Sequence, residues 1–166
     1  PAPSSNRCWR LKQPAFDNDL APEFYFPARS HQGALLKLRY LIEHRKGMGL
    51  VVGDHGVGKT FLTYVLEREL QTAQSRFIRV VFPLLTPAEL LRYVALQFGV
   101  VQSSDAAQIP TDVVLSRLEG WLINRPSGTT PPVLVVDDAH LLEPSQLQTL
   151  QFLLNLGRGA GSLSLL

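Results

Sequence analysis

The sequence predicts an α/β protein with a mostly parallel sheet, and three observations support this prediction. Short apolar runs of strand length alternate along the chain with longer segments whose apolar residues recur at helical spacing. One of these runs, Val133–Val136, is apolar at every position, which is typical of a parallel strand buried on both faces. A glycine-rich turn at residues 53–58 joins another run to a helical segment. Strands and helices that alternate in this way form parallel sheets with right-handed crossovers.

The helices and strands are predicted from these periodicities and from local start and stop signals. The predicted elements, in chain order, are a helix over about residues 31–46, a strand over 48–52, a helix from about residue 59, a strand over 77–82, helices beginning at residues 87 and 111, a strand over 133–136, a helix beginning at residue 144, and a strand in the last residues. Ser30 can cap the first helix, and Gly47 and Gly49 can end it.

Two of these helices carry signals that place individual residues. Thr86 and Glu89 form a capping box, and the proline that follows Thr86 suits the first position of a helix. In the helix beginning at residue 144, Leu147, Leu150 and Leu154 recur at helical spacing. We therefore expect these three leucines to face the core.

Residues 1–29 are predicted to form an extended leader, and residues 30–166 a single core. The leader holds five of the twelve prolines, and proline interrupts both helices and strand ladders. Its adjacent aromatic residues, Phe24-Tyr25-Phe26, are expected to lie on the core. At the other end, Leu163–Leu166 is apolar without a polar cap, and we expect the chain to be cut within the fourth strand of the core.

The composition excludes several classes of protein. Apolar residues make up 45% of the 166 residues, too many for a disordered chain, and the length suits about one domain. No apolar run reaches the ~18 residues of a membrane span and no signal peptide is evident, which favours a cytoplasmic protein. Cys8 is the only cysteine, so an internal disulfide is excluded. The net charge of +2, without a basic run, neither indicates nor excludes a nucleic-acid surface.

Residues 53–60 match the phosphate-loop pattern G-x-x-x-x-G-K-[ST], and each part of the pattern has a physical role. The matching residues are Gly53, Asp54, His55, Gly56, Val57, Gly58, Lys59 and Thr60. The glycines let successive backbone N–H groups point at one centre, and the helix that begins near Lys59 adds its N-terminal dipole. Lys59 is expected to contact the β- and γ-phosphates of ATP, and Thr60 to offer its hydroxyl to Mg²⁺.

An acidic pair follows the most apolar strand. Asp137 and Asp138 come directly after Val133–Val136. An aspartate pair alone is as typical of a turn as of a metal site, but a phosphate loop needs an acidic residue at the end of a neighbouring strand to hold Mg²⁺. We therefore expect Asp137 to hold Mg²⁺ and Asp138 to polarise the attacking water. Adjacent carboxylates beside bound phosphates repel one another unless a cation lies between them, so Mg²⁺ is expected as part of the site.

Together with these motifs, several segments resemble AAA+ ATPases of the general secretion pathway protein A type. They are LKQPAF at residues 11–16, FYFP at 24–27, SHQGAL at 30–35, LIEHRKGMGL at 41–50 and LLTPAELL at 84–91. The resemblance implies the three-layer αβα sandwich of P-loop NTPases and an Mg²⁺-dependent ATPase that forms a homo-oligomer. It also implies a role in bacterial secretion, pilus or exopolysaccharide export. A polar sensor, an arginine finger, a helical lid and any membrane association would lie in a region beyond residue 166.

One departure from the family pattern bears on turnover. The family usually has glutamate where this chain has Asp138, whose carboxylate is one methylene shorter, so we expect intact ATP binding but slower hydrolysis. A slow-turnover nucleotide switch is therefore one alternative function. A DNA-associated ATPase of the transposition type, a more distant resemblance, is another, although the near-balanced charge argues mildly against it.

Two histidines near these motifs have two interpretations each. In the resembling family the leader and the first helix flank the adenine pocket, which would place His31 near the base; otherwise His31 is a capping or exposed side chain. His140 either senses the nucleotide state or makes a structural hydrogen bond.

Overall fold

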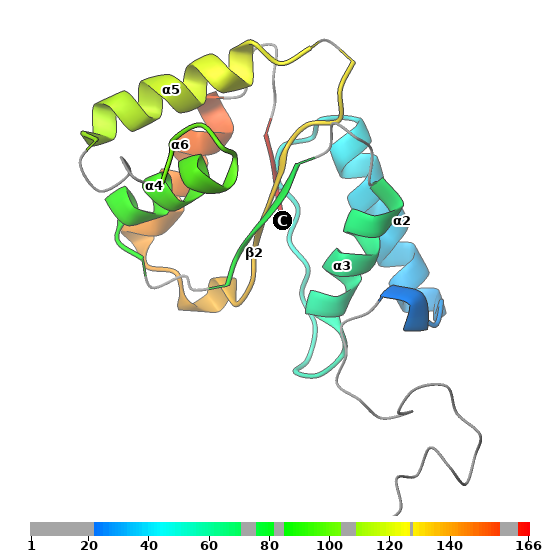
Figure 1. Cartoon of the computed structure of the whole chain (residues 1–166). Coiled ribbons are helices and arrows are strands. Elements are labelled where there is room, and N and C mark those ends of the chain that lie inside the picture. Colours follow the sequence, from blue (N-terminus) through cyan, green and yellow to red (C-terminus); the bar gives the residue numbers. More distant parts are fainter. Residues whose placement is uncertain (1–21, 71–75, 82–84, 104–108, 127, 157–162) are drawn as a thin grey trace, which may run out of the picture.

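The computed structural model describes residues 22–70, 76–81, 85–103, 109–126, 128–156 and 163–166. This described part is an α/β fold whose parallel strands lie between two groups of helices (Figure 1). The strands are β1 (Phe77–Val80), β2 (Val133–Val136) and β3 (Ser164–Leu165), in the spatial order β1-β2-β3. The predicted fold class and the parallel sheet are confirmed.

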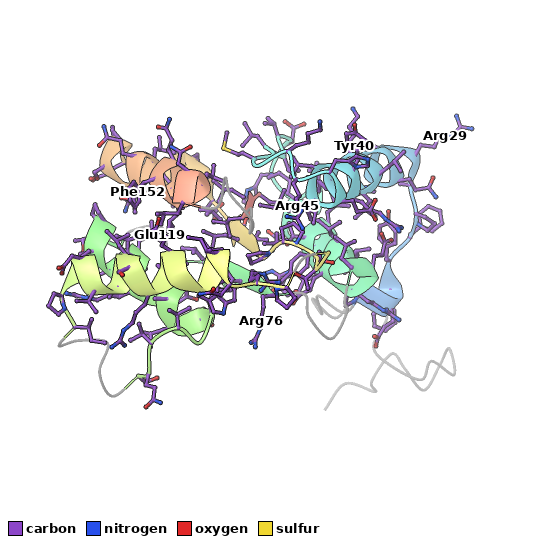
Figure 2. All side chains as sticks on the ribbon, turned by 90° about the horizontal axis from the view of Figure 1, so that it is seen from above. Arg29, Tyr40, Arg45, Arg76, Glu119 and Phe152 are labelled. Carbon is purple, nitrogen blue, oxygen red and sulfur yellow. The ribbon has the colours of Figure 1, made fainter. Side chains whose placement is uncertain are left out.

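Helices cover both faces of this sheet, which gives the predicted three layers. On one side lie α2 (Arg29–Glu43) and α3 (Lys59–Leu70). On the other lie α4 (Pro87–Gln97), α5 (Thr111–Ile123) and α6 (Pro144–Leu156). The view from above shows the same division (Figure 2).

Strand β2 is buried on both faces and divides the core in two. Leu134 packs among residues of α4, α5 and α6 in one buried cluster. Val133 and Val135 pack among residues of α2 and α3 in the other cluster. Successive side chains of a strand point to opposite faces, so a strand between two helical layers must be apolar throughout. The apolar run Val133–Val136 satisfies this requirement.

The capping box predicted before α4 is present. The hydroxyl of Thr86 accepts a hydrogen bond from the backbone N–H of Glu89 at 3.4 Å, and the Glu89 carboxylate accepts one from the backbone N–H of Thr86 at 2.8 Å. These two bonds satisfy N–H groups that a helix N-terminus otherwise leaves without partners. At the other end, Gly99 adopts a φ of 72°, a left-handed conformation that stops the helix.

The strand predicted over residues 48–52 is a single bridge instead. Met48 pairs in parallel with Leu165, and the N–H of Gly49 donates to the carbonyl of Leu165 at 2.8 Å. The facing strand β3 has only two residues, so the ladder extends no further. The side chains of Leu50 and Val52 are 75% and 82% exposed, so burial does not hold this segment against the sheet.

Helix α2 differs from its predicted bounds at both ends. It begins at Arg29, one residue before the expected cap Ser30, and Ala28 precedes it without a side-chain cap. It ends at Glu43 rather than near residue 46, because Arg45 adopts a φ of 51°, a left-handed conformation that cannot continue a helix.

The buried face of α6 differs from the predicted one at Leu147, which is 52% exposed. Leu150 is buried and Leu154 packs partly buried against the core, as predicted, and Leu153 is buried as well. Gln146 is buried instead of Leu147, because its side-chain amide donates to the carbonyl of Leu85 at 2.6 Å while its amide oxygen accepts from the backbone N–H of Glu143 at 2.7 Å. These bonds turn the first turn of α6 so that Leu147 points outward.

Only part of the predicted leader can be described. Pro22–Phe24 forms a short 3-10 helix, and the ring of Tyr25 lies 6.2 Å from that of Phe61 on α3, measured between centroids. Phe26 is exposed. The rest of the leader, residues 1–21, which includes Cys8, lies outside the described residues. Among the described helices, none combines the length and the apolar character that crossing a membrane requires.

Candidate nucleotide-binding site

The loop at residues 53–58, which is the predicted phosphate loop, contains two glycines in left-handed backbone conformations. Gly56 and Gly58 adopt φ angles of 78° and 86°, which residues with a Cβ rarely adopt. Helix α3 begins directly after the loop, at Lys59. The N-terminus of α3 therefore carries free N–H groups and a positive dipole end at the point where the loop closes.

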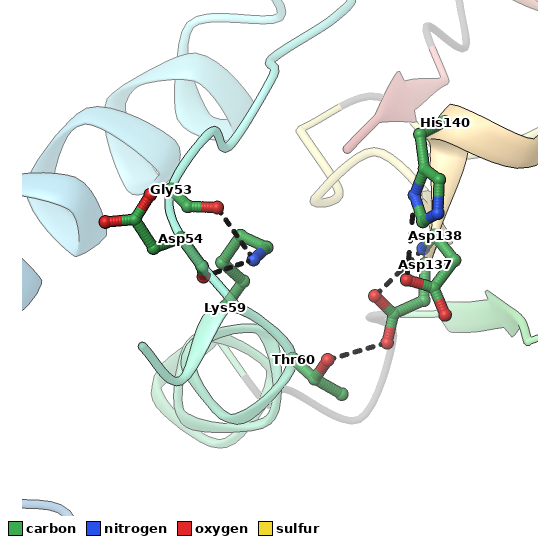
Figure 3. A network of polar contacts seen from close by, with 7 residues as sticks. All are labelled: Gly53, Asp54, Lys59, Thr60, Asp137, Asp138 and His140. Atoms are coloured by element: carbon green, nitrogen blue, oxygen red, sulfur yellow. Dashed lines mark hydrogen bonds and ion pairs between the residues drawn. The ribbon is translucent and has the colours of Figure 1, made fainter. Parts of the chain in front are cut away.

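The ammonium of Lys59 lies across this loop. Its Nζ donates to the carbonyl of Gly53 at 2.9 Å and to the carbonyl of Asp54 at 2.8 Å (Figure 3). The side chain thus folds back over the loop that precedes it instead of extending into solvent. This position keeps a positive charge at the loop.

A side-chain hydrogen bond joins the phosphate loop to the end of β2. The hydroxyl of Thr60 donates to Oδ2 of Asp137 at 2.7 Å, across 77 positions of sequence (Figure 3). Asp137 continues the β2 ladder, since its backbone N–H donates to the carbonyl of Val80 at 3.2 Å. The other carboxylate oxygen of Asp137 accepts from the N–H of Asp138 at 3.0 Å. The sheet and α3 together fix the Asp137 carboxylate beside the loop.

Asp138 lies at the same end of the sheet in an unusual backbone conformation. Its φ of 51° and ψ of 41° are left-handed, a conformation that aspartate tolerates better than most residues. Its carboxylate is exposed, and Oδ1 lies 3.8 Å from Nδ1 of the exposed His140. An exposed pair at this distance contributes little to stability.

A cavity of about 400 Å³ opens between the loop and the strand end. Its lining includes His55, Lys59, Asp137, Asp138 and His140. Residues from both the phosphate-loop and the acidic-pair motifs therefore lie around one space, although Thr60 is not part of its lining. A second cavity of about 310 Å³ lies on the α2 side of the loop.

One residue of this second cavity makes a contact that sequence reasoning missed. Nε2 of His31 lies 2.9 Å from the carbonyl oxygen of Val57, in the phosphate loop. Neither capping nor exposure describes this side chain, because it bonds to a residue 26 positions away. No local pattern connects the two residues, so only the packing of α2 against the loop reveals the contact.

The donor set around Thr60 and Asp137 suits Mg²⁺. Mg²⁺ prefers oxygen ligands and is usually held by one or two carboxylates together with substrate phosphates, not by a cage of protein side chains. The Thr60 hydroxyl and the Asp137 carboxylate supply two such oxygens 2.7 Å apart. Within the described ranges, no group of three or more histidine, cysteine, aspartate or glutamate side chains forms a metal cage.

Fold and loop together define the class of protein. A parallel α/β sheet, a glycine-rich loop that leads into a helix, and an acidic residue at the end of the neighbouring strand are the features of P-loop NTPases. Within this class, the AAA domain family matches residues 42–166, well over half of the chain. The chain belongs to this family.

A curated relative extends the similarity toward the N-terminus. The chain is 30% identical over 147 residues to general secretion pathway protein A of Aeromonas hydrophila. The alignment covers 88% of this chain but only 26% of that protein. The chain thus spans about a quarter of the length of this relative, and the similarity concerns that part alone.

Proposed function

We propose that this chain is the nucleotide-binding core of an AAA ATPase that binds ATP with Mg²⁺ and hydrolyses the γ-phosphate. The observation that carries the proposal is the 2.7 Å hydrogen bond between Thr60 and Asp137, which joins the loop to the strand end. Membership of the AAA domain family supports it independently. Residues 30–166 would form the core and residues 1–29 the leader.

The phosphates of ATP would be held by the loop from Gly53 to Thr60. Its backbone N–H groups and the α3 N-terminus supply donors, and Lys59 supplies a charge. Thr60 and Asp137 would hold Mg²⁺, which neutralises phosphate charge when bound. The present bonds of Lys59 to two carbonyls keep its ammonium at the loop before any ligand arrives.

Hydrolysis requires a base beside the attacking water, and we assign this role to Asp138. The water oxygen bonds to the γ-phosphorus, the bond from that phosphorus to the β–γ bridging oxygen breaks, and ADP and phosphate leave. Asp138 accepts the proton of the water. Its exposed carboxylate on the 400 Å³ cavity is available for this. The short side chain favours slow turnover, so a nucleotide switch that hydrolyses ATP slowly is a variant of this proposal.

The process served is proposed from the relative. The name of the relative, general secretion pathway protein A of Aeromonas hydrophila, refers to secretion. We propose that this chain powers assembly of a secretion, pilus or exopolysaccharide export system as part of a homo-oligomer. ATP binding would close the oligomer, and hydrolysis would reset it.

A DNA-associated ATPase is the second candidate, and one basic cluster favours it. Arg45 and Arg125 donate to the neighbouring carbonyls of Thr129 and Thr130, at 3.3 and 3.0 Å. Burial lowers the pKa of Arg125, and the positive charges of Arg76 and Arg45 lower it further. Arg45 and Arg76 lie near the middle of the view from above (Figure 2). Three guanidinium groups gathered in this way could contact phosphates of DNA.

The experiment that separates these functions combines ATP turnover with DNA binding. The ATPase proposal predicts phosphate release from ATP that is lost in Lys59→Ala and kept in the matched control Lys37→Ala, an exposed lysine of α2. The DNA candidate predicts a gel shift that weakens steeply with salt and with Arg76→Ala. If DNA shows no gel shift at any salt concentration, the chain is not a DNA-associated ATPase.

A further inference from the structure

A histidine of α2 holds one peptide group of the phosphate loop. Nε2 of His31 lies 2.9 Å from the carbonyl oxygen of Val57. The ring also lies near the next residue: a Cβ built on Gly58 would lie 3.6 Å from the same nitrogen. The other ring nitrogen, Nδ1, is buried and has no hydrogen-bond partner among the described residues.

The hydrogen bond defines which ring nitrogen carries the proton. A carbonyl oxygen only accepts, so Nε2 of His31 must be the donor. In a neutral ring Nδ1 is then an acceptor, but it is buried and has no partner. Among the described residues, the ring's hydrogen bond is therefore the one to Val57. This bond to Val57 therefore holds the ring beside the loop.

This bond controls the direction of an N–H group. The carbonyl of Val57 and the N–H of Gly58 belong to one peptide group, and the described chain contains no cis peptide bond. In a trans peptide these two groups point in opposite directions. A carbonyl drawn toward α2 therefore turns the N–H of Gly58 away from α2, toward the space that the loop encloses.

Such control is needed because glycine does not restrain this peptide. Gly58 has a φ of 86°, and glycine populates positive and negative φ about equally. The peptide group between Val57 and Gly58 can therefore rotate at little steric cost. A phosphate cradle works only when its N–H groups point at the anion together, so one reversed peptide removes a donor and presents a repelling carbonyl.

We propose that His31 is a positioning residue that presets the phosphate cradle by fixing the Val57 carbonyl. The proposal rests on the proposed function, because it assumes that the loop binds phosphates. His31 would act on the phosphates of the nucleotide and not on its base. This separates it from the expectation that His31 lies near adenine.

Two substitutions test the donor itself. His31→Gln keeps an N–H at the Nε2 position, because the amide nitrogen of glutamine is as many bonds from Cβ as Nε2 is. His31→Leu keeps an apolar side chain of moderate size but removes the donor. The measurement is the dissociation constant for ATP and for inorganic tripolyphosphate, each in wild type and both variants, with the thermal unfolding midpoint recorded alongside.

We expect His31→Leu to weaken the binding of both ligands roughly tenfold, which is about the largest effect of losing a single hydrogen bond. His31→Gln should restore both to within about threefold of wild type, by the same reasoning. A loss for ATP with unchanged tripolyphosphate binding would overturn the proposal, because it would place His31 at the base. Equal binding by His31→Leu and wild type would overturn it as well.

The amide NMR signal of Gly58 in the nucleotide-free protein supplies a second readout that does not depend on ligand binding. Both variants lose the imidazole ring and its effect on this signal, so the signal should lie further from its wild-type position in His31→Leu than in His31→Gln; equal shifts in the two variants contradict the proposal. If His31→Leu does not fold, His31→Asn replaces it, because its amide lies at the Nδ1 position, away from Val57. If wild type and Lys59→Ala both fail to bind ATP and tripolyphosphate, the proposed function itself fails and this inference with it.

Discussion

At the residue scale, the two carboxylates at the end of β2 occupy different environments. Both oxygens of Asp137 accept hydrogen bonds, from the Thr60 hydroxyl and from the N–H of Asp138. The Asp138 carboxylate is exposed, and its Oδ1 lies 3.8 Å from the ring of His140. The Asp137 carboxylate is thus fixed in place, which suits the proposed metal ligand, and the Asp138 carboxylate is open to solvent, which suits the proposed base.

Substitution of Asp138 separates binding from turnover. Asp138→Asn keeps the left-handed backbone that asparagine also tolerates but cannot accept the proton of water, so ATP turnover should fall by at least about a hundredfold while ATP affinity stays. Asp138→Glu should raise turnover, because its carboxylate reaches one methylene further. Phosphate release and ATP affinity measured on the same preparations check this.

The Asp138→Glu substitution should also lower stability, so the unfolding midpoint must be measured beside the turnover. Glutamate tolerates a φ of 51° less well than aspartate, so Asp138→Glu should lower the unfolding midpoint slightly. Asp138→Gly, which relieves the backbone but supplies no carboxylate, is the matched control. If Asp138→Glu folds and shows no gain in turnover, the assignment of a shortened base is wrong.

The sequence predicts, for a physical reason, the loop and strand-end residues that the structure brings together. A phosphate loop needs glycine, lysine and threonine at a fixed spacing because one short segment must supply all the groups. That local requirement locates Lys59 and Thr60 in the sequence. The contact of His31 with Val57 has no such signature, because it depends on how α2 packs against the loop.

At the element scale, α4 shows how local signals determine an element. Its N-terminus is closed by the reciprocal bonds of Thr86 and Glu89, which involve only residues three positions apart. Hydrogen bonds from the side chain and backbone of Thr86 lower the pKa of Glu89, because they favour its charged form. This shift makes the stability of the capped helix depend on pH.

The pH dependence has a definite sign. Because the pKa of Glu89 is lower in the folded state than its ordinary value of 4.5, its contribution to stability is fully present above about pH 4.5 and is lost as the pH falls through the lowered value. Urea midpoints of wild type and Glu89→Gln should therefore differ near neutral pH and converge at acidic pH. Glu119→Gln, on an exposed face of α5, is the control. A difference that persists unchanged in acid contradicts the capping-box account.

Other elements depend on contacts with residues far away in the sequence, which local patterns do not indicate. The run at residues 48–52 has the composition of a strand, but a ladder also needs a facing backbone, and only Met48 finds one in Leu165. Likewise the period of α6 predicts a leucine face, whereas the bonds of Gln146 to Leu85 and Glu143 orient its first turn. Val133–Val136 succeeds as a prediction because burial on both faces leaves an unmistakable apolar run.

At the scale of the whole molecule, the two core clusters lie on opposite faces of strand β2. Leu134 belongs to the cluster with α4, α5 and α6, and the flanking Val133 and Val135 belong to the cluster with α2 and α3. The phosphate loop leads into α3, and Asp137 follows β2. The geometry of the site therefore depends on both clusters being intact.

Leu134→Ala tests this dependence. The side chain is fully buried, so its truncation should lower the free energy of unfolding by about 3 kcal/mol and shift a single unfolding transition. Leu36→Ala, at an exposed position of α2, should change it by less than about 0.5 kcal/mol. Circular dichroism and tryptophan fluorescence in urea measure both. Two separate transitions in the Leu134 variant would show that the clusters unfold independently.

The central claim is that the loop and the end of β2 form one Mg²⁺–ATP site. Titration of ATP by calorimetry, in Mg²⁺ and in EDTA, tests it most directly with wild type, Lys59→Ala and Asp137→Asn. We predict that Mg²⁺ strengthens ATP binding to wild type and that Asp137→Asn keeps the affinity in EDTA but loses the gain from Mg²⁺. Lys59→Ala should weaken binding at least about tenfold in both buffers. Unchanged ATP binding by Lys59→Ala, or an undiminished Mg²⁺ gain in Asp137→Asn, would contradict the account.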